Sequence, residues 1–104
     1  MVKFLKINGA DHPVRISYYA LKMLKEKTGK ALSKIADDDF ESYETLLFYS
    51  LKKGAQATGG EFTFKETDME DVMDEVFMDF MALIPLFFAP PQPTEMTGGN
   101  KQKK

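Results

Sequence analysis

The chain has 104 residues, of which 43% are hydrophobic, and a formal net charge of −2. This length fits one small globular domain, and the near-neutral charge gives no electrostatic reason to bind nucleic acid or an anionic membrane. Cysteine is absent, which excludes disulfides, thiolate catalysis and thiolate metal sites. The N-terminal stretch MVKFLKING lacks the apolar core of a signal peptide, so we expect a cytoplasmic protein.

A β-hairpin is predicted at the N-terminus. Residues 2–7 and 13–16 have β character and flank Asn8-Gly9, the dipeptide best suited to the positive φ angles of a tight turn. Two strands alone are marginally stable in water, so a helix must cover one face of the hairpin. The only histidine, His12, lies beside this turn without the partners that a zinc site requires, and we expect a solvated or structural role.

The first helix is predicted to begin near Ser17 and to end at Gly29. Serine is a suitable N-cap, and glycine accepts the left-handed conformation at a helix end. Lysines dominate the exposed surface of this helix. Residues 31–35 are expected to add a short turn before an acidic break in the chain.

The second helix is predicted to begin at a cluster of three aspartates, residues 37–39, which can cap its N-terminus. We expect this helix to end at Gly54, directly after two lysines that suit a helix C-terminus. The loop that follows has Gly59-Gly60 near its centre. Phe62 and Phe64 alternate with a threonine in this loop, which indicates either a short strand or a pair of packing anchors.

The strongest helical pattern covers residues 67–88, TDMEDVMDEVFMDFMALIPLFF. Its apolar residues recur at alternating steps of three and four, which places them on one stripe of a helix. The stripe consists of Met69, Val72, Met73, Val76, Phe77, Phe80, Met81 and Ile84. Thr67 with Glu70 has the sequence of a capping box, and Asp68 is the alternative cap.

The end of this helix has the clearest consequence for function. From Phe80 onward the acids stop, and FMALIPLFFA is apolar all round, so one buried face cannot account for every side chain. These residues either join a core shared with the first two helices or form a contact surface for another copy or another protein. We predict a partner-binding surface made of Leu83, Ile84, Leu86, Phe87 and Phe88. The run is too short to cross a bilayer, which needs about 20 apolar residues, although a shallow interfacial contact stays open.

Charge is segregated along the chain. Residues 66–79 contain seven acids and no base, a charge of −7, whereas residues 22–34 contain five lysines and one glutamate, a charge of +4. The two segments can complement each other within one molecule or between neighbouring copies. Each exposed ion pair would contribute only about 0–1 kcal/mol.

The sequence contains no arrangement of residues that supports catalysis. Phosphate-binding glycine motifs and a nucleophile elbow are absent, and the acidic clusters lack the spacing of a calcium loop. We therefore expect no enzyme, no cofactor and no metal site. Three lysines near the C-terminus are weak grounds for nucleic-acid binding and are interpreted as a solubilising tail.

These patterns together predict a small α+β fold. An N-terminal β-hairpin packs on three main α-helices in a single domain of residues 1–89, followed by a disordered Pro/Gly/Lys tail of residues 90–104. We see no internal repeat and no second domain.

The order of these elements resembles a known family. An ING hairpin, a helix that closes on LKEKTGK, and an acid-capped helix with the sequence FESYETLLFYSLKKG are similar to the tail assembly chaperones of long-tailed bacteriophages and prophages. The resemblance covers roughly residues 1–85. Its individual motifs are short, so their order along the chain counts as much as any single match.

The resemblance implies a non-catalytic protein that coats the hydrophobic tape measure protein and helps to recruit tail tube subunits. It also implies a homo-oligomer, which would lie in the host cell cytoplasm if the chain is phage-encoded. From the charge and the short apolar run, we expect no nucleic-acid partner and no membrane. The sequence leaves two alternatives open: a structural or connector protein of the virion tail, and a small regulatory module that binds one other protein.

Overall fold

The computed structural model describes residues 2–88, and the tail expected at residues 90–104 lies outside them. The elements follow in the order β1 (Lys3–Ile7), β2 (Ala10–Val14), α1 (Tyr18–Thr28), η1 (Leu32–Lys34), α2 (Phe40–Thr58), η2 (Glu66–Asp68) and α3 (Met69–Phe88). Here η1 and η2 are short 3₁₀ helices. The predicted α+β fold, a hairpin with three main helices, is confirmed.

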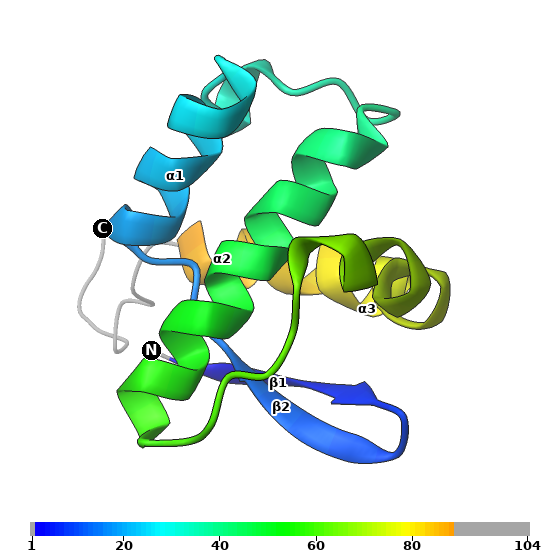
Figure 1. Ribbon diagram of the computed structural model, residues 1–104. Coiled ribbons are helices and arrows are strands. Elements are labelled where there is room, and N and C mark those ends of the chain that lie inside the picture. Colours follow the sequence, from blue (N-terminus) through cyan, green and yellow to red (C-terminus); the bar gives the residue numbers. More distant parts are fainter. Residues whose placement is uncertain (1, 89–104) are drawn as a thin grey trace, which may run out of the picture.

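The helices are layered over the hairpin. Helix α2 packs on β2, α3 packs on β1, and α1 lies alongside α2 (Figure 1). Helix α3 crosses behind α2 in this view, so that its two ends lie on different sides of α2. The most deeply buried side chains come from all these layers, and they include Val14, Leu24, Leu46, Val76 and Phe80. A single core therefore holds the hairpin and the three helices together.

The hairpin turns at Asn8-Gly9, as predicted. Both residues have positive φ angles, 53° and 81°, which match the right-handed twist of the flanking strands. The second strand was predicted too late in the chain, because it begins at Ala10 rather than at residue 13. A two-residue turn brings Ala10 directly opposite Ile7, so pairing starts there and continues to Lys3 opposite Val14.

Helix α1 has both of its predicted ends. The Ser17 Oγ accepts the Ala20 N–H at 3.4 Å, and Gly29 takes the left-handed conformation with a φ of 75°. The short turn expected at residues 31–35 is η1. Local capping signals were therefore sufficient to place this part of the chain.

Helix α2 starts as predicted but does not end at Gly54. Asp39 caps its start, and the helix continues to Thr58, where Gly59 ends it with a φ of 73°. Gly54 instead faces the hairpin, because a Cβ on it would lie 2.2 Å from the Pro13 carbonyl oxygen. This glycine allows the backbones of α2 and β2 to approach closely.

The loop after α2 is anchored by aromatic side chains, and no strand forms there. Phe62 packs edge-to-face against Phe48 with ring centroids 5.3 Å apart, and Phe64 packs against His12 at 5.1 Å. Of the two possibilities for Phe62 and Phe64, packing anchors are therefore correct. The His12 ring packs against this anchor, in line with the structural role expected for it.

Helix α3 buries the predicted stripe. Met69, Val72, Met73, Val76 and Phe80 are buried, whereas Phe77, Met81 and Ile84 are half-buried. The helix begins at Met69, two residues after Thr67, and η2 precedes it. The predicted caps of α3 at Thr67 and Asp68 are wrong, because both residues lie within η2, where Asp68 accepts the Lys65 N–H at 2.8 Å. Helix α3 continues through Pro85 to Phe88.

Replacing Gly54 by alanine should lower the free energy of unfolding by about 1–3 kcal/mol, because the added methyl group collides with the Pro13 backbone and α2 must shift away from β2. The helix preference of alanine recovers at most about 1 kcal/mol of this loss. Urea unfolding followed by circular dichroism measures the change.

Gly60→Ala is the matched control, since an added Cβ there would lie 3.5 Å from the Thr58 Oγ1, an ordinary contact. Its free energy of unfolding should stay within about 0.5 kcal/mol of the parent value. Equal losses for both variants would contradict the role of Gly54 in close packing.

Candidate protein-binding surface

The five residues predicted to bind a partner lie on the last turns of α3, and the structure divides them into two groups. Leu83, Ile84 and Phe87 are half-buried and pack against the core. Leu86 and Phe88 are each 48% exposed and are not among the residues that pack on the core. The core interpretation thus holds for Leu83, Ile84 and Phe87, and the contact surface stays a prediction for Leu86 and Phe88.

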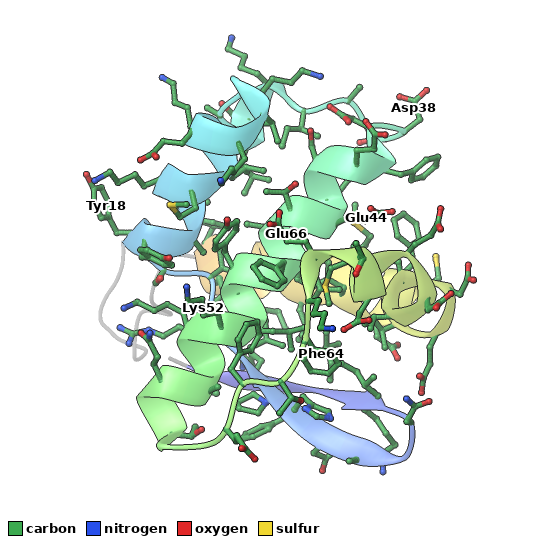
Figure 2. All side chains as sticks on the ribbon, viewed as in Figure 1. Tyr18, Asp38, Glu44, Lys52, Phe64 and Glu66 are labelled. Atoms are coloured by element: carbon green, nitrogen blue, oxygen red, sulfur yellow. The ribbon has the colours of Figure 1, made fainter. Side chains whose placement is uncertain are left out.

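An open apolar hollow of about 880 Å³ lies between α1, η1 and the end of α3. We call it the α1–α3 groove, and its lining residues are Tyr18, Leu21, Lys22, Lys25, Glu26, Ala31, Leu32, Ser33 and Phe88. The Tyr18 side chain extends outward from α1 (Figure 2) and is 80% exposed. The groove therefore combines apolar walls with charged side chains.

Sequence reasoning identified only the α3 side of this groove. The α1 wall comes from Tyr18, Leu21 and Lys25, which share one side of the helix at spacings of three and four residues. Ala20 and Leu24 occupy the buried side. The sequence does show that α1 has apolar residues beyond its buried side, such as Tyr18 and Leu21. It does not show which part of the molecule these residues lie against.

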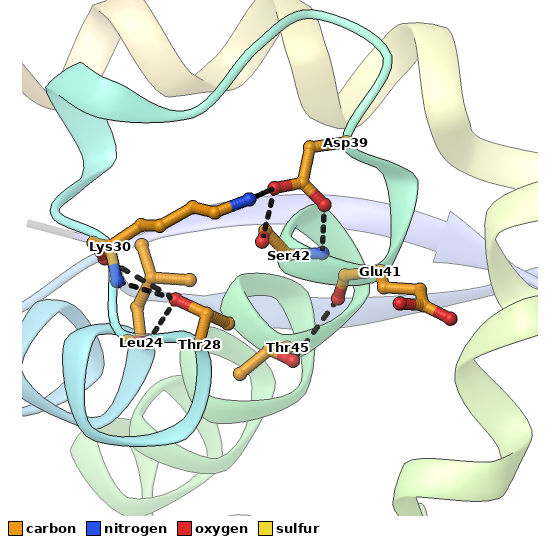
Figure 3. A network of polar contacts seen from close by, with 7 residues as sticks. All are labelled: Leu24, Thr28, Lys30, Asp39, Glu41, Ser42 and Thr45. Atoms are coloured by element: carbon orange, nitrogen blue, oxygen red, sulfur yellow. Dashed lines mark hydrogen bonds and ion pairs between the residues drawn. The ribbon is translucent and has the colours of Figure 1, made fainter.

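A polar network holds the far end of α1 against the start of α2 (Figure 3). The Asp39 carboxylate accepts a hydrogen bond from Lys30 Nζ at 2.6 Å and another from the Ser42 hydroxyl at 2.8 Å. The Lys30 N–H donates to Thr28 Oγ1, which in turn donates to the Leu24 carbonyl. The bond from Lys30 is the main cause of a lowered pKa for Asp39. Lys30 and Asp39 lie at the two ends of the segment that contains η1. Their contact therefore helps to fix the position of residues 31–33, which line the groove.

The groove lysines have no ionic partner in the described part of the chain. Between residues 2 and 88 the ion pairs are Lys6 with Asp11 at 4.0 Å and Lys30 with Asp39 at 2.6 Å. Lys22 and Lys25 are exposed and belong to neither pair. Between residues 2 and 88, the lysines of α1 therefore form no ion pair with the acids of α3. Pairing between neighbouring copies is the possibility that stays open.

A second hollow, of about 340 Å³, lies between α2 and α3 on a different part of the molecule. Its lining residues are Phe40, Glu44, Glu70, Met73, Asp74 and Phe77, and we call this surface the acidic face. Phe40 is 56% exposed and packs edge-to-face on Phe77 at 5.8 Å. Burial raises the pKa of the Glu44 carboxyl, and the nearby Glu70 and Glu41 raise it further. The acidic face thus holds like charges close together beside an exposed aromatic ring.

The described residues offer no site for a metal ion. No group of three or more histidine, cysteine or acidic side chains between residues 2 and 88 is arranged to hold one. Acids of the two acidic clusters in the sequence, at residues 37–39 and 71–75, have structural partners, because Asp39 caps α2 and Glu75 accepts the Asn8 N–H at 3.0 Å. No helix in the same range is long and apolar enough to cross a membrane.

Comparison with known proteins adds no relative. No family model matches the chain, and no curated protein or solved structure matches it. The shape and charge of the two surfaces are therefore the basis for a functional proposal, together with the order of sequence motifs.

At about pH 7, Glu44→Gln should raise Tm, because the amide removes a charge that burial and two like charges disfavour. A raised pKa means that the folded state binds a proton more readily than the unfolded state. The cost is present above the folded pKa and disappears below the ordinary value of 4.5.

Thermal unfolding of parent and variant at several pH values between about 7 and 4 measures this difference, which should shrink as the pH falls. Glu61→Gln is the control, because Glu61 is exposed in the loop after α2 and lies outside the acidic face. A Tm difference for Glu44→Gln that grows with falling pH would show that the sign is wrong.

Proposed function

We propose that this chain is a tail assembly chaperone of a long-tailed bacteriophage or prophage. It would keep the tape measure protein soluble in the host cytoplasm until tail tube subunits arrive. The observation that carries the proposal is the exposed apolar end of α3 beside the open α1–α3 groove. The order of the ING hairpin, the LKEKTGK helix and the acid-capped helix supports the same family.

The groove suits a client helix with one apolar stripe. Helix-in-groove binding places apolar anchors at three- and four-residue spacing against an apolar surface. Tyr18, Leu21, Leu32 and Phe88 provide that surface, and Lys22 can contact acids beside the stripe. Noncovalent binding at an open groove is reversible, which a chaperone needs if tube subunits are to replace it.

Co-expression with the tape measure protein tests the proposal directly. The tagged chain should recover a soluble complex with many copies per client, measured by affinity capture and light-scattering mass. An insoluble client and a chain that elutes alone would contradict it. Mass spectrometry of purified virions separates the alternatives, because a chaperone is absent from the particle, whereas a structural or connector protein is present.

The double variant Leu86→Gln/Phe88→Gln should weaken client capture by roughly thirtyfold. Each side chain is about half exposed, so its burial by a client contributes about 1 kcal/mol, and the pair contributes about 2 kcal/mol. Circular dichroism should be unchanged, since neither residue belongs to the core. Titration of a labelled client helix, followed by fluorescence anisotropy, measures the affinity.

Phe4→Gln is the matched control for this variant. Phe4 is 57% exposed, a comparable apolar exposure, but it lies on the hairpin and outside the α1–α3 groove. Its affinity for the client helix should equal that of the parent. Equal losses for the control and the double variant would place the client surface elsewhere.

A further inference from the structure

Two complementary surfaces lie on different sides of this molecule, and neither has a partner in the described residues. The α1–α3 groove exposes the Tyr18 ring beside Lys22 and Lys25. The acidic face exposes the Phe40 ring beside carboxylates that include Glu70 and Asp74. Both surfaces thus present an aromatic side chain next to charge: the groove lining has two lysines and one acid, Glu26, whereas the acidic face has three acids and no base.

The fold prevents these surfaces from meeting within one copy. In Figure 1, α1 and the C-terminal end of α3 lie on one side of α2, whereas the N-terminal half of α3 lies on the other side. Helix α2 packs against both α1 and α3, and so separates α1 from the N-terminal half of α3. Within residues 2–88, the charges of these two surfaces therefore do not neutralise one another.

We propose that copies of this chain associate head to tail, with the acidic face of one copy covering the α1–α3 groove of the next. Lys22 and Lys25 then approach Glu70 and Asp74 of the neighbouring copy, and the Phe40 ring covers apolar groove surface. Charge complementarity selects a second copy as the occupant, because the acidic face has acids at its rim and no base among its lining residues.

The electrostatics of the acidic face support this arrangement. Burial is the main cause of the raised pKa of Glu44, and the nearby charges of Glu70 and Glu41 raise it further, so like charges repel one another on this face at neutral pH. A lysine from a neighbouring copy would relieve that repulsion. Association should therefore be strongest at low ionic strength, where exposed charges are least screened.

The geometry also limits the kind of assembly. A contact between two different surfaces is heterologous, and it produces rings or open chains rather than a closed two-fold dimer. We therefore expect the mass to rise with concentration beyond that of a dimer. At the end of an open chain, one copy keeps its groove uncovered.

Self-association has a regulatory consequence for the chain, which rests on the proposed function. Self-association covers the same apolar groove that a client helix would occupy. Copies therefore protect one another's grooves until a client displaces the neighbour. Client and self-association compete, so a client helix should dissociate the assemblies.

Two charge-reversal variants test the head-to-tail contact. Lys22→Glu/Lys25→Glu makes the groove acidic, and Glu70→Lys/Asp74→Lys makes the acidic face basic. All four side chains are exposed, and circular dichroism checks that both variants fold. Each variant alone should self-associate at least about tenfold more weakly than the parent, because like charges then face each other.

An equimolar mixture of the two variants should recover association, since each acidic surface then meets a basic one in an alternating chain. Sedimentation velocity at about 50 mM and about 500 mM NaCl measures the masses, and the recovered association should be lost at high salt. A parent protein that stays monomeric, a variant that associates as the parent does, or a mixture that stays monomeric would overturn the proposal.

Client capture by the same variants separates this inference from the proposed function. If the parent protein captures the client helix but does not self-associate, only the head-to-tail contact is overturned. Self-association without capture supports that contact and removes the chaperone function. Both readouts use the full chain.

Discussion

The close approach of α2 to β2 is the constraint on which the rest of the structure depends. Gly54 leaves room for the Pro13 carbonyl, and one turn earlier the Ser50 carbonyl accepts the Arg15 N–H at 3.0 Å. With the hairpin held this closely, α3 can pack on β1 and on α2 at once, with Phe80 fully buried. The Glu75 carboxylate then ties α3 to the Asn8 N–H at the hairpin turn. The direction of α3 is set by these contacts, and its apolar end is carried towards α1.

Local signals in the sequence were enough to predict much of this fold. Capping residues such as Ser17 and Asp39 act over three residues, and the stripe of α3 repeats with the helical period, so neither needs tertiary information. Gly54 was misread because a glycine that ends a helix and a glycine that admits a neighbouring backbone look alike in sequence. The α1 wall of the groove was missed for a similar reason, since only packing shows which surface faces the end of α3.

The segregation of charge has a structural basis in the way that α2 divides the molecule. Lysines gather on α1 and acids on the N-terminal half of α3, and α2, which contacts both helices, lies between these two charged segments. Such an arrangement leaves self-repulsion on each side instead of neutralising it internally. The segregated charges favour association with other molecules of opposite charge. The α1–α3 groove provides the apolar area that stabilises such a contact. The proposed chaperone function and the proposed self-association both use the α1–α3 groove, through its apolar lining and its lysines.

Methyl-resolved NMR of the leucine-labelled chain, titrated with an apolar, acid-flanked client helix, would examine the groove most directly. Leu21, Leu32 and Leu86 line the groove or lie at the adjacent end of α3, whereas Leu24, Leu46 and Leu47 are fully buried references. We predict that the methyl signals of the first three shift or broaden on titration and that those of the buried three stay in place. Shifts confined to the hairpin, or no shift at saturating client, would contradict a binding surface at the end of α3.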